Sequence, residues 1–118
     1  FIWNNNNHGS GDLRGAYAPK YEMVLYGHKG RSLFRYKRLA DVMDCDKVSG
    51  NKSQHPTEKP VDLLKTFIMN NSDEGDVIFD GFMGVGSTGV ACKELNRDFI
   101  GCEIDDGYFK IAQERLND

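Results

Sequence analysis

A glycine-rich loop between a predicted strand and a predicted helix constrains the fold of this chain more than any other feature. Gly84, Gly86 and Gly89 form a G-x-G-x-x-G pattern directly after the short apolar stretch 76–80. Glycine suits such a loop because the backbone must turn sharply and let a ligand approach closely. The pattern alone is a weak signal. Its position between a strand and a helix favours a nucleoside-binding half-sheet over a plain glycine turn.

Two acidic residues add chemical detail to this loop. Glu103 closes the next predicted strand, nineteen residues after Gly84, where a carboxylate can accept hydrogen bonds from both hydroxyls of a ribose. Asp80 stands four residues before Gly84. A carboxylate there would attract the ammonium group of S-adenosylmethionine (SAM) and repel the pyrophosphate of a dinucleotide. Charge therefore favours SAM over NAD as the ligand.

Secondary-structure signals alternate regularly after residue 60. Pro60 suits a first helical turn, and apolar residues then recur at helical spacing. The predicted order is a helix at 60–70, a strand at 76–80, a helix capped by Ser87 or Thr88 and reaching about 96, a strand at 98–103, and a last helix at 108–116. This order predicts parallel strands joined by helical crossovers, an α/β layered sheet.

The first half is less regular. Its predicted elements are the end of a strand at 1–3, a loop at 4–11, a strand at 21–26, a turn at 27–30, a second strand at 32–36 and a loop at 37–54. The two strands on either side of the turn predict a β-hairpin region before the α/β part.

Composition limits the classes that remain. The chain has 118 residues, enough for one small domain, and it begins with Phe1, which indicates a piece of a longer protein. It carries no membrane-length apolar run and no signal peptide, so no membrane partner is expected. Three cysteines without C-x-x-C spacing and three scattered histidines argue against a disulfide framework and against any metal site.

Charge is distributed unevenly. Residues 1–60 hold ten Lys and Arg against six Asp and Glu, whereas residues 61–118 hold five against twelve. The first half is therefore expected to face something anionic. Its basic cluster could contact phosphate groups or could form a solvated strand face, and both interpretations stay open: Arg31, Arg35, Lys37 and Arg38.

Three segments resemble the DNA N6-adenine and N4-cytosine methyltransferases. The segment 80–88, D-G-F-M-G-V-G-S-T, is similar to that family's SAM-binding motif D-P-F-x-G-x-G-T, with Gly81 in place of the proline and Ser87 before the threonine. The segment 55–60, H-P-T-E-K-P, resembles its highly specific H-P-T-x-K-P element, and 99–105 resembles its F-x-G-x-E-x-D strand end. The strong match covers 55–116, and the first thirty residues match more loosely.

The resemblance implies a partial Rossmann-like SAM-methyltransferase fold with three parts. Residues 1–30 would be strands that follow the catalytic motif, 31–54 a short target-recognition segment, and 55–118 the SAM-binding half. The cofactor would be S-adenosyl-L-methionine, held by residues of the three matching segments: His55, Thr57, Lys59, Asp80, Phe82, Gly84, Gly86, Ser87, Thr88, Glu103 and Ile104.

The family's catalytic motif, [D/N/S]-P-P-[Y/F/W], is absent. The three prolines are Pro19, Pro56 and Pro60, and none are adjacent. No catalytic residue is therefore assigned, and this chain alone is expected to transfer no methyl group. A SAM motif close to the C-terminus, with strand-like material before it, resembles the family's beta class, in which the catalytic motif comes first.

The parent protein is accordingly expected to methylate the exocyclic amine of adenine (N6) or cytosine (N4) in double-stranded DNA, in a bacterial or phage cytoplasm. The resemblance leaves a homodimer and a cognate restriction endonuclease open as partners. Alternatives are an RNA methyltransferase, a non-catalytic SAM- or DNA-binding remnant and, more distantly, an NAD-dependent oxidoreductase. The catalytic motif in the sequence before Phe1 would separate the DNA methyltransferase from the RNA methyltransferase and from the non-catalytic remnant.

Overall fold

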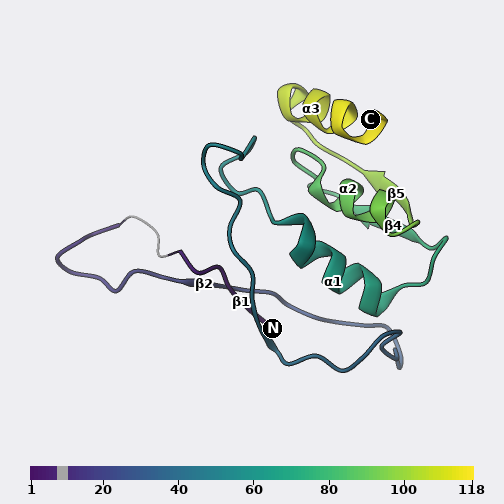
Figure 1. Ribbon diagram of the computed structural model, residues 1–118, viewed down its shortest axis with the longest axis horizontal. Helices are drawn as coiled ribbons and strands as arrows, with labels where there is room; N and C mark the ends of the chain where they lie inside the picture. The colour runs from purple at the N-terminus through teal and green to yellow at the C-terminus, as the bar shows by residue number, and fades with distance from the viewer. Residues whose placement is uncertain (8–10) are drawn as a thin grey trace.

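The structure, a computed structural model, describes residues 1–7 and 11–118. The described part holds two small sheets and three helices (Figure 1). The strands are β1 (Ile2–Asn4), β2 (Tyr21–Met23), β3 (Val42–Asp44), β4 (Val77–Asp80) and β5 (Asp98–Gly101). The helices are α1 (Val61–Asn71), α2 (Ser87–Glu94) and α3 (Asp106–Asn117).

The C-terminal half has the predicted α/β alternation. β4 and β5 pair in parallel, with Val77 opposite Asp98, and α2 forms the crossover between them. α2 packs against β5 on one side and against α1 and α3 elsewhere. Parallel strands need such a crossover because a short turn cannot return the chain to the same end of the sheet.

The core of this half lies between α1, α2 and the strand pair. Ile68 of α1 meets Ala91 and Cys92 of α2, and the partly buried side chains around them include Ile78 and Phe99 from the two strands. Apolar residues recur at helical spacing along α1, so they lie on one face of the helix, and this face packs against α2 as the sequence predicts.

The N-terminal sheet differs from the predicted hairpin. β1 lies in the centre, antiparallel to β2 and parallel to β3. Trp3 anchors it: the indole is 1% exposed, and its N–H donates to the carbonyl of Cys45 at 2.6 Å. β3 lies inside the stretch 37–54 that was expected to be a loop, and β2 pairs with β1 rather than with a strand at 32–36.

The strand predicted at 32–36 is wrong, and the end of α1 explains why. The N–H of Arg35 donates to the carbonyl of Asn70 at 2.9 Å, and the N–H groups of Tyr36 and Lys37 donate to the Asn70 side-chain oxygen at 3.3 and 3.0 Å. Backbone donors that a ladder would need are therefore bound to a helix terminus. The Asn70 amide in turn donates to the carbonyl of Lys37 at 2.9 Å.

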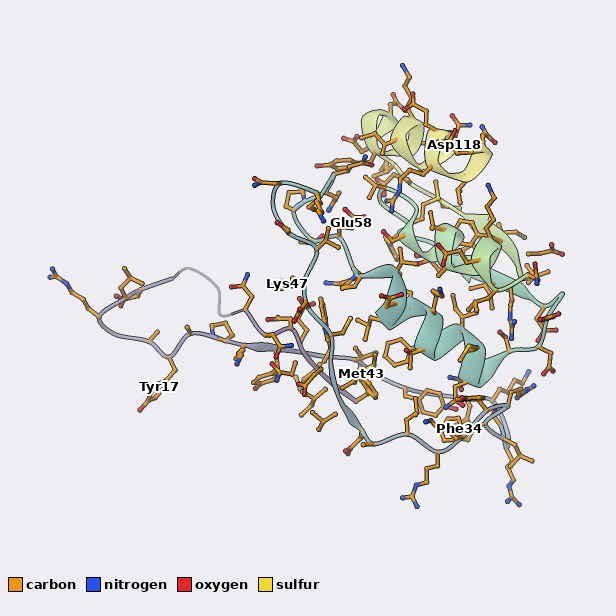
Figure 2. The ribbon with its side chains drawn as sticks, in the orientation of Figure 1. Tyr17, Phe34, Met43, Lys47, Glu58 and Asp118 are labelled. Carbon is orange, nitrogen blue, oxygen red and sulfur yellow. The ribbon has the colours of Figure 1, made fainter. Side chains whose placement is uncertain are left out.

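Residues 4–11 only partly form the predicted loop. Asn4 belongs to β1 and Asn5 is buried, whereas Asn6 and Asn7 follow as exposed residues. His8, Gly9 and Ser10 lie outside the described residues. Residues 11–20 form an arm that extends from the rest of the molecule, with Tyr17 fully exposed, and returns at Lys20, whose carbonyl accepts from the N–H of Asn5 at 3.1 Å (Figure 2).

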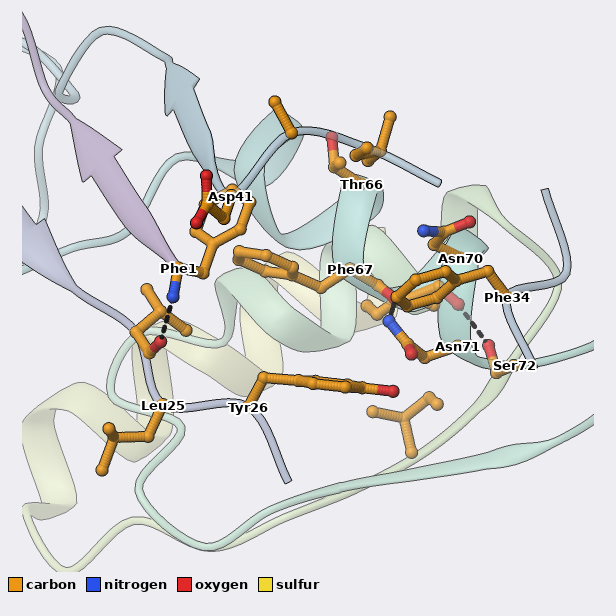
Figure 3. A pocket seen from close by; sticks show the side chains of 15 residues that line it. Phe1, Leu25, Tyr26, Phe34, Asp41, Thr66, Phe67, Asn70, Asn71 and Ser72 are labelled. Atoms are coloured by element: carbon orange, nitrogen blue, oxygen red, sulfur yellow. Dashed lines mark hydrogen bonds between the residues drawn. The ribbon is translucent and has the colours of Figure 1, made fainter. Parts of the chain in front are cut away.

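An apolar groove of about 530 Å³ lies between α1 and the N-terminal segments (Figure 3). Phe67 of α1 faces Phe1 edge to face, with ring centroids 4.8 Å apart, and Tyr26 and Phe34 line the groove from the chain beyond β2. The groove lies between the two sheets, which are not hydrogen-bonded to each other in the described part of the chain.

Candidate cofactor site

A second cavity, of about 350 Å³, lies where the glycine loop meets the H-P-T-E-K-P segment. Nine of the eleven residues expected to hold the cofactor line it: His55, Thr57, Lys59, Asp80, Phe82, Gly84, Ser87, Thr88 and Glu103. The cavity is at the carboxyl ends of β4 and β5, since Asp80 ends β4 and Glu103 follows β5 by two residues. Open parallel α/β sheets bind ligands at this edge.

Asp80 is held by the glycine loop that follows it. One carboxylate oxygen accepts from the N–H of Phe82 at 3.0 Å, and the other accepts from the hydroxyl of Thr88 at 2.6 Å. These contacts fix an acidic group at the cavity wall. A fixed carboxylate suits a cationic ligand group such as an ammonium.

Glu103 is tied to the same loop from the other strand. Its carboxylate accepts from the N–H of Gly84 at 2.9 Å and from the N–H of Asp105 at 2.9 Å. A carboxylate has about four acceptor positions, so each oxygen can still accept one further hydrogen bond. The geometry is compatible with a pair of ligand hydroxyls.

The predicted side-chain cap of α2 is wrong. Gly86 occupies the cap position with φ of 81°, and neither Ser87 nor Thr88 makes a capping hydrogen bond. Ser87 instead contacts Glu58, and Thr88 contacts Asp80. A left-handed residue lets the chain enter the helix directly from the loop, and this conformation favours glycine.

Gly86 and Ile104 do not line the cavity. A Cβ atom on Gly86 would lie 3.0 Å from the Cβ of Ala112, so this glycine lets α3 approach the loop closely. Ile104 is 99% exposed beyond Glu103. Phe82 does line the cavity, although 95% of it is exposed.

The loop 53–59 forms the opposite wall. The N–H of Thr57 donates to Nδ1 of His55 at 3.0 Å, so Nδ1 is the acceptor in this contact. The His55 ring also faces Tyr108 of α3, with centroids 4.3 Å apart. Lys59 points toward the N-terminal sheet, where its ammonium lies 2.6 Å from the Glu22 carboxylate and 5.4 Å from the Trp3 ring.

Four further residues line the cavity, although the sequence did not indicate them as cofactor-binding residues: Glu58, Leu64, Met83 and Val85. Glu58 stands at the variable position of the H-P-T-x-K-P element and Val85 at a variable position of the glycine loop. A motif read by its fixed letters therefore gives no signal for them.

The basic cluster lies away from this cavity. Arg35 lies beside the last turn of α1, where its side chain pairs with Asp73 at 3.4 Å. The cavity lies at the other end of the same helix, where Leu64 of the first turn lines it. The Lys37 ammonium lies 5.5 Å from the Tyr36 ring centre. Phosphate contact by these residues stays a prediction.

Among residues 1–7 and 11–118, no cluster of His, Cys, Asp and Glu could hold a metal ion, and none of the helices could cross a bilayer.

A parallel strand pair with a glycine loop, an acidic residue after each strand and a cavity between them defines a nucleoside-binding α/β protein. Comparison with known proteins narrows this class. The family described as DNA methylase (N6_N4_Mtase) matches residues 2–114. The chain belongs to this family.

Individual relatives agree. The chain is 47% identical over 116 residues to the type II methyltransferase M2.LlaDCHI of Lactococcus lactis, covering 98% of this chain and 40% of that protein. It is 36% identical over 98 residues to the type II methyltransferase M.HpaI of Haemophilus parainfluenzae, covering 83% of this chain and 30% of that one. The crystal structure of the M1.HpyAVI–SAM complex superposes with a TM-score of 0.80 at 32% identity, over 98% of this chain and 60% of that one.

The first relatives are all considerably longer. The chain spans between 30% and 46% of the length of four curated relatives that it matches. The partial Rossmann-like methyltransferase fold predicted from the sequence is confirmed by these matches.

Proposed function

We propose that this chain is the SAM-binding part of a DNA methyltransferase whose target is the exocyclic amine of adenine or cytosine. The observation that carries the proposal is the cavity where Asp80, Glu103 and the H-P-T-E-K-P segment meet. M1.HpyAVI, which shares this fold at 32% identity, was crystallised with SAM. SAM supplies an electrophilic methyl group when it is bound.

The residues of the cavity fit SAM better than a dinucleotide. Glu103 offers acceptors for ribose hydroxyls, and Asp80 offers a fixed negative charge for the ammonium of the methionine end. A pyrophosphate in the same place would meet the Asp80 carboxylate directly. The exposed apolar side chains of Phe82 and Ile104 are proposed to cover the adenine base, because a flat ring gains most from such surfaces.

Titration calorimetry tests which of the candidate ligands the chain binds. The purified chain should bind SAM and S-adenosylhomocysteine and should bind NAD much more weakly. Tighter binding of NAD than of either SAM-derived ligand would overturn the assignment.

The rest of the reaction needs groups that this chain does not carry. An exocyclic amine is a poor nucleophile because its lone pair is delocalised into the base, so the base must be flipped out and its amino group must meet hydrogen-bond acceptors. The family's proline-containing catalytic motif supplies these groups, and no two prolines are adjacent here. We propose that this chain binds the methyl donor while another part of the parent protein holds the base.

The apolar groove supports this division. The chain superposes on M1.HpyAVI over 98% of its own length but only 60% of that protein. In the described part the strands form two separate sheets, and the groove lies between α1 and the N-terminal segments. Its proposed occupant is an extended apolar segment from the part of the parent protein that this chain does not span.

Double-stranded DNA is the proposed substrate, because the relatives are named as type II methyltransferases and the family is described as DNA methylase. The type II names also support a cognate restriction endonuclease as partner, and the bacterial relatives support the bacterial cytoplasm as location.

Measuring DNA affinity at several salt concentrations tests whether the basic cluster contacts phosphates: Arg31, Arg35, Lys37 and Arg38. Each lost contact should reduce the slope of log affinity against log salt by roughly 0.9. An unchanged slope would leave them as solvated surface residues.

A further inference from the structure

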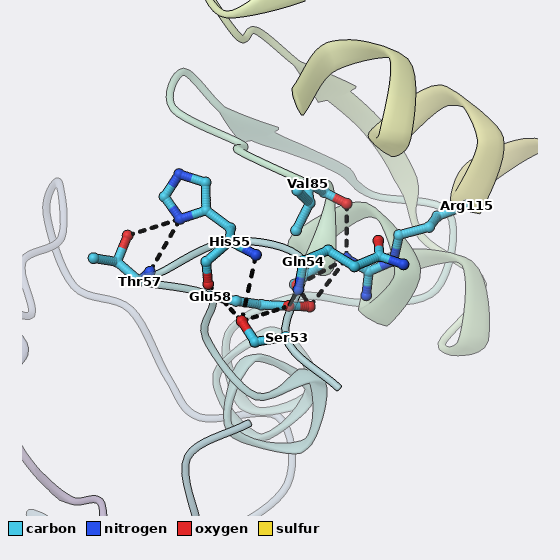
Figure 4. A network of polar contacts seen from close by, with 8 residues as sticks. Ser53, Gln54, His55, Thr57, Glu58, Val85 and Arg115 are labelled. Carbon is cyan, nitrogen blue, oxygen red and sulfur yellow. Dashed lines mark hydrogen bonds and ion pairs between the residues drawn. The ribbon is translucent and has the colours of Figure 1, made fainter. Parts of the chain in front are cut away.

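The Glu58 carboxylate lies at the centre of a polar network (Figure 4). Its side chain is 6% exposed. One carboxylate oxygen accepts from Arg115 at 3.1 Å and from the hydroxyl of Ser87 at 3.1 Å. The other accepts from the N–H of Gln54 at 3.0 Å, and the Ser53 hydroxyl, which donates to the carbonyl of His55, lies 3.4 Å from it.

These four neighbours of the carboxylate come from three separate parts of the fold. Ser53 and Gln54 belong to the loop that forms one cavity wall, Ser87 begins α2 after the glycine loop, and Arg115 lies on α3. Arg115 extends the network, since the same nitrogen donates to the carbonyl of Val85 at 2.8 Å. Val85 lies between the two glycines of the G-x-G sequence. One carboxylate thus connects both walls of the cavity to α3.

The Glu58 carboxylate has little acceptor capacity left for a ligand. A carboxylate accepts about four hydrogen bonds. Gln54, Ser87 and Arg115 supply three of them, and the side chain is only 6% exposed. Although Glu58 lines the cavity, it is therefore unsuited to bind the cofactor directly. Its contacts can act on the ligand only through the position of the residues around it.

The next residue is held in a different direction. The Lys59 ammonium pairs with Glu22 on β2, in the N-terminal sheet. Glu58 and Lys59 therefore fasten the H-P-T-E-K-P segment to the two halves of the molecule. His55 and Thr57, on the cavity wall, lie immediately before this double attachment.

We infer that Glu58 is a positioning residue: together with Arg115 it fixes the 53–59 loop against the glycine loop and so sets the affinity of the cofactor site. The inference rests on the proposed SAM binding for its ligand, and on the Glu58–Arg115–Ser87 contacts for its geometry. Removing the charge should leave Arg115 partly buried without its carboxylate partner and should loosen both walls.

The first measurement needs no cofactor. Hydrogen exchange on the folded full chain compares wild type with Glu58→Gln, and with Glu114→Gln as the matched control, since Glu114 is exposed on the same helix as Arg115. Glu58→Gln should speed amide exchange at least fivefold in 53–59 and 84–87 and leave the centre of α1 unchanged. Equal rates in wild type and Glu58→Gln, or a uniform rise across the whole chain, would overturn the inference.

The second measurement is the dissociation constant of S-adenosylhomocysteine, by calorimetry at a temperature where every variant is folded. Glu58→Gln and Arg115→Met should each weaken binding about tenfold, and the double variant should weaken it little further, because both changes break the same contact. Arg115→Lys keeps the charge without the planar guanidinium and should fall between wild type and Arg115→Met. Fully multiplicative losses, or unchanged affinity in Glu58→Gln, would remove the positioning role.

The two measurements separate this inference from the proposed function. If wild type binds no SAM-derived ligand, the proposed function fails, and the exchange experiment still decides whether Glu58 fixes the loop. If Glu58→Gln does not stay folded, Ser87→Ala removes one donor of the same network and keeps the charge pair. It should raise exchange in 53–59 by a smaller factor, and no change in that variant would count against the network.

Discussion

The hydroxyl of Thr88 donates a hydrogen bond to the Asp80 carboxylate at 2.6 Å. This bond joins the end of β4 to the first turn of α2, across the glycine loop. The contact explains why a residue placed to cap a helix does not cap it. The hydroxyl is committed to a carboxylate, and Gly86 makes the turn instead.

Thr88→Val should therefore destabilise the fold by about 1.5–3 kcal/mol, the usual scale for a hydrogen bond to a charged group. Valine matches threonine in shape, so the change removes the hydroxyl and little else. Urea unfolding measures the effect. Thr88→Ser, which keeps the hydroxyl, is the control and should lose less than Thr88→Val; equal losses would show that shape, not the hydrogen bond, matters.

Glu103→Ala should weaken SAM binding by ~1–3 kcal/mol, because ribose hydroxyls would lose a charged acceptor. Glu103→Gln should cost less, since one acceptor oxygen remains. Calorimetry on the folded variants gives both values. An Ala variant that binds as tightly as wild type would rule out the ribose contact.

Gly86→Ala should lower the free energy of unfolding by about 1–3 kcal/mol, the cost of an unfavourable backbone conformation at a fixed position. The new methyl group would also press on Ala112, 3.0 Å away. Gly11→Ala is the control, because a Cβ there meets nothing within 4 Å. Thermal or urea unfolding of the two variants should differ clearly, and similar stabilities would contradict the close approach of α3.

Burial raises the pKa of the Cys92 thiol; Arg97 opposes the shift and Asp80 adds to it. The folded state then holds the thiol proton more tightly than the unfolded chain, so this stabilisation is complete below the unfolded pKa of roughly 8.5. It is lost as pH rises from there toward the folded pKa. The free energy of unfolding should fall as the pH rises above the unfolded pKa, and less steeply in Cys92→Ala. Parallel slopes would show that other groups cause the fall.

The chain alone, saturated with SAM, should incorporate no radiolabelled methyl groups into unmethylated DNA. Adding the remaining part of the parent protein as a separate polypeptide should restore transfer, because that part would supply the base-binding groups. Phe34→Lys, in the groove, should reduce this restoration, whereas Leu33→Lys, exposed and outside the groove lining, should not. Sustained transfer by the chain alone, abolished by Asp80→Ala, would place a catalytic centre within it.

The sequence predicted the C-terminal half well because its signals are local. The apolar spacing of α1, the short strands around 78 and 100 and the glycine loop each lie within a few residues. The N-terminal half depends on distant partners instead. Nothing near Val42 indicates that β3 pairs with β1, and nothing near Arg35 indicates that Asn70 takes its backbone hydrogen bonds. Strand propensity at 32–36 was therefore overridden by a tertiary contact.

The site shows the same division. Asp80 and Glu103 could be identified because their chemistry follows from their places after two strands. Glu58 could not, because its role arises from a contact with Arg115, fifty-seven residues away. The sequence correctly placed Gly86 in the glycine loop. Its close approach to Ala112 could not be predicted, because it depends on where α3 lies, which no local pattern specifies.

The pairing of β1 with β3 has a consequence for how the chain acquires its structure. Ile2 pairs with Val42, forty residues downstream, whereas Val77 and Asp98, in β4 and β5, are separated by twenty-one. Closing a longer loop costs more entropy before its contacts form, and distant pairings tend to form late. β1 should therefore find its place later than β4 and β5 find each other, with Trp3 accessible to water until β3 has been made.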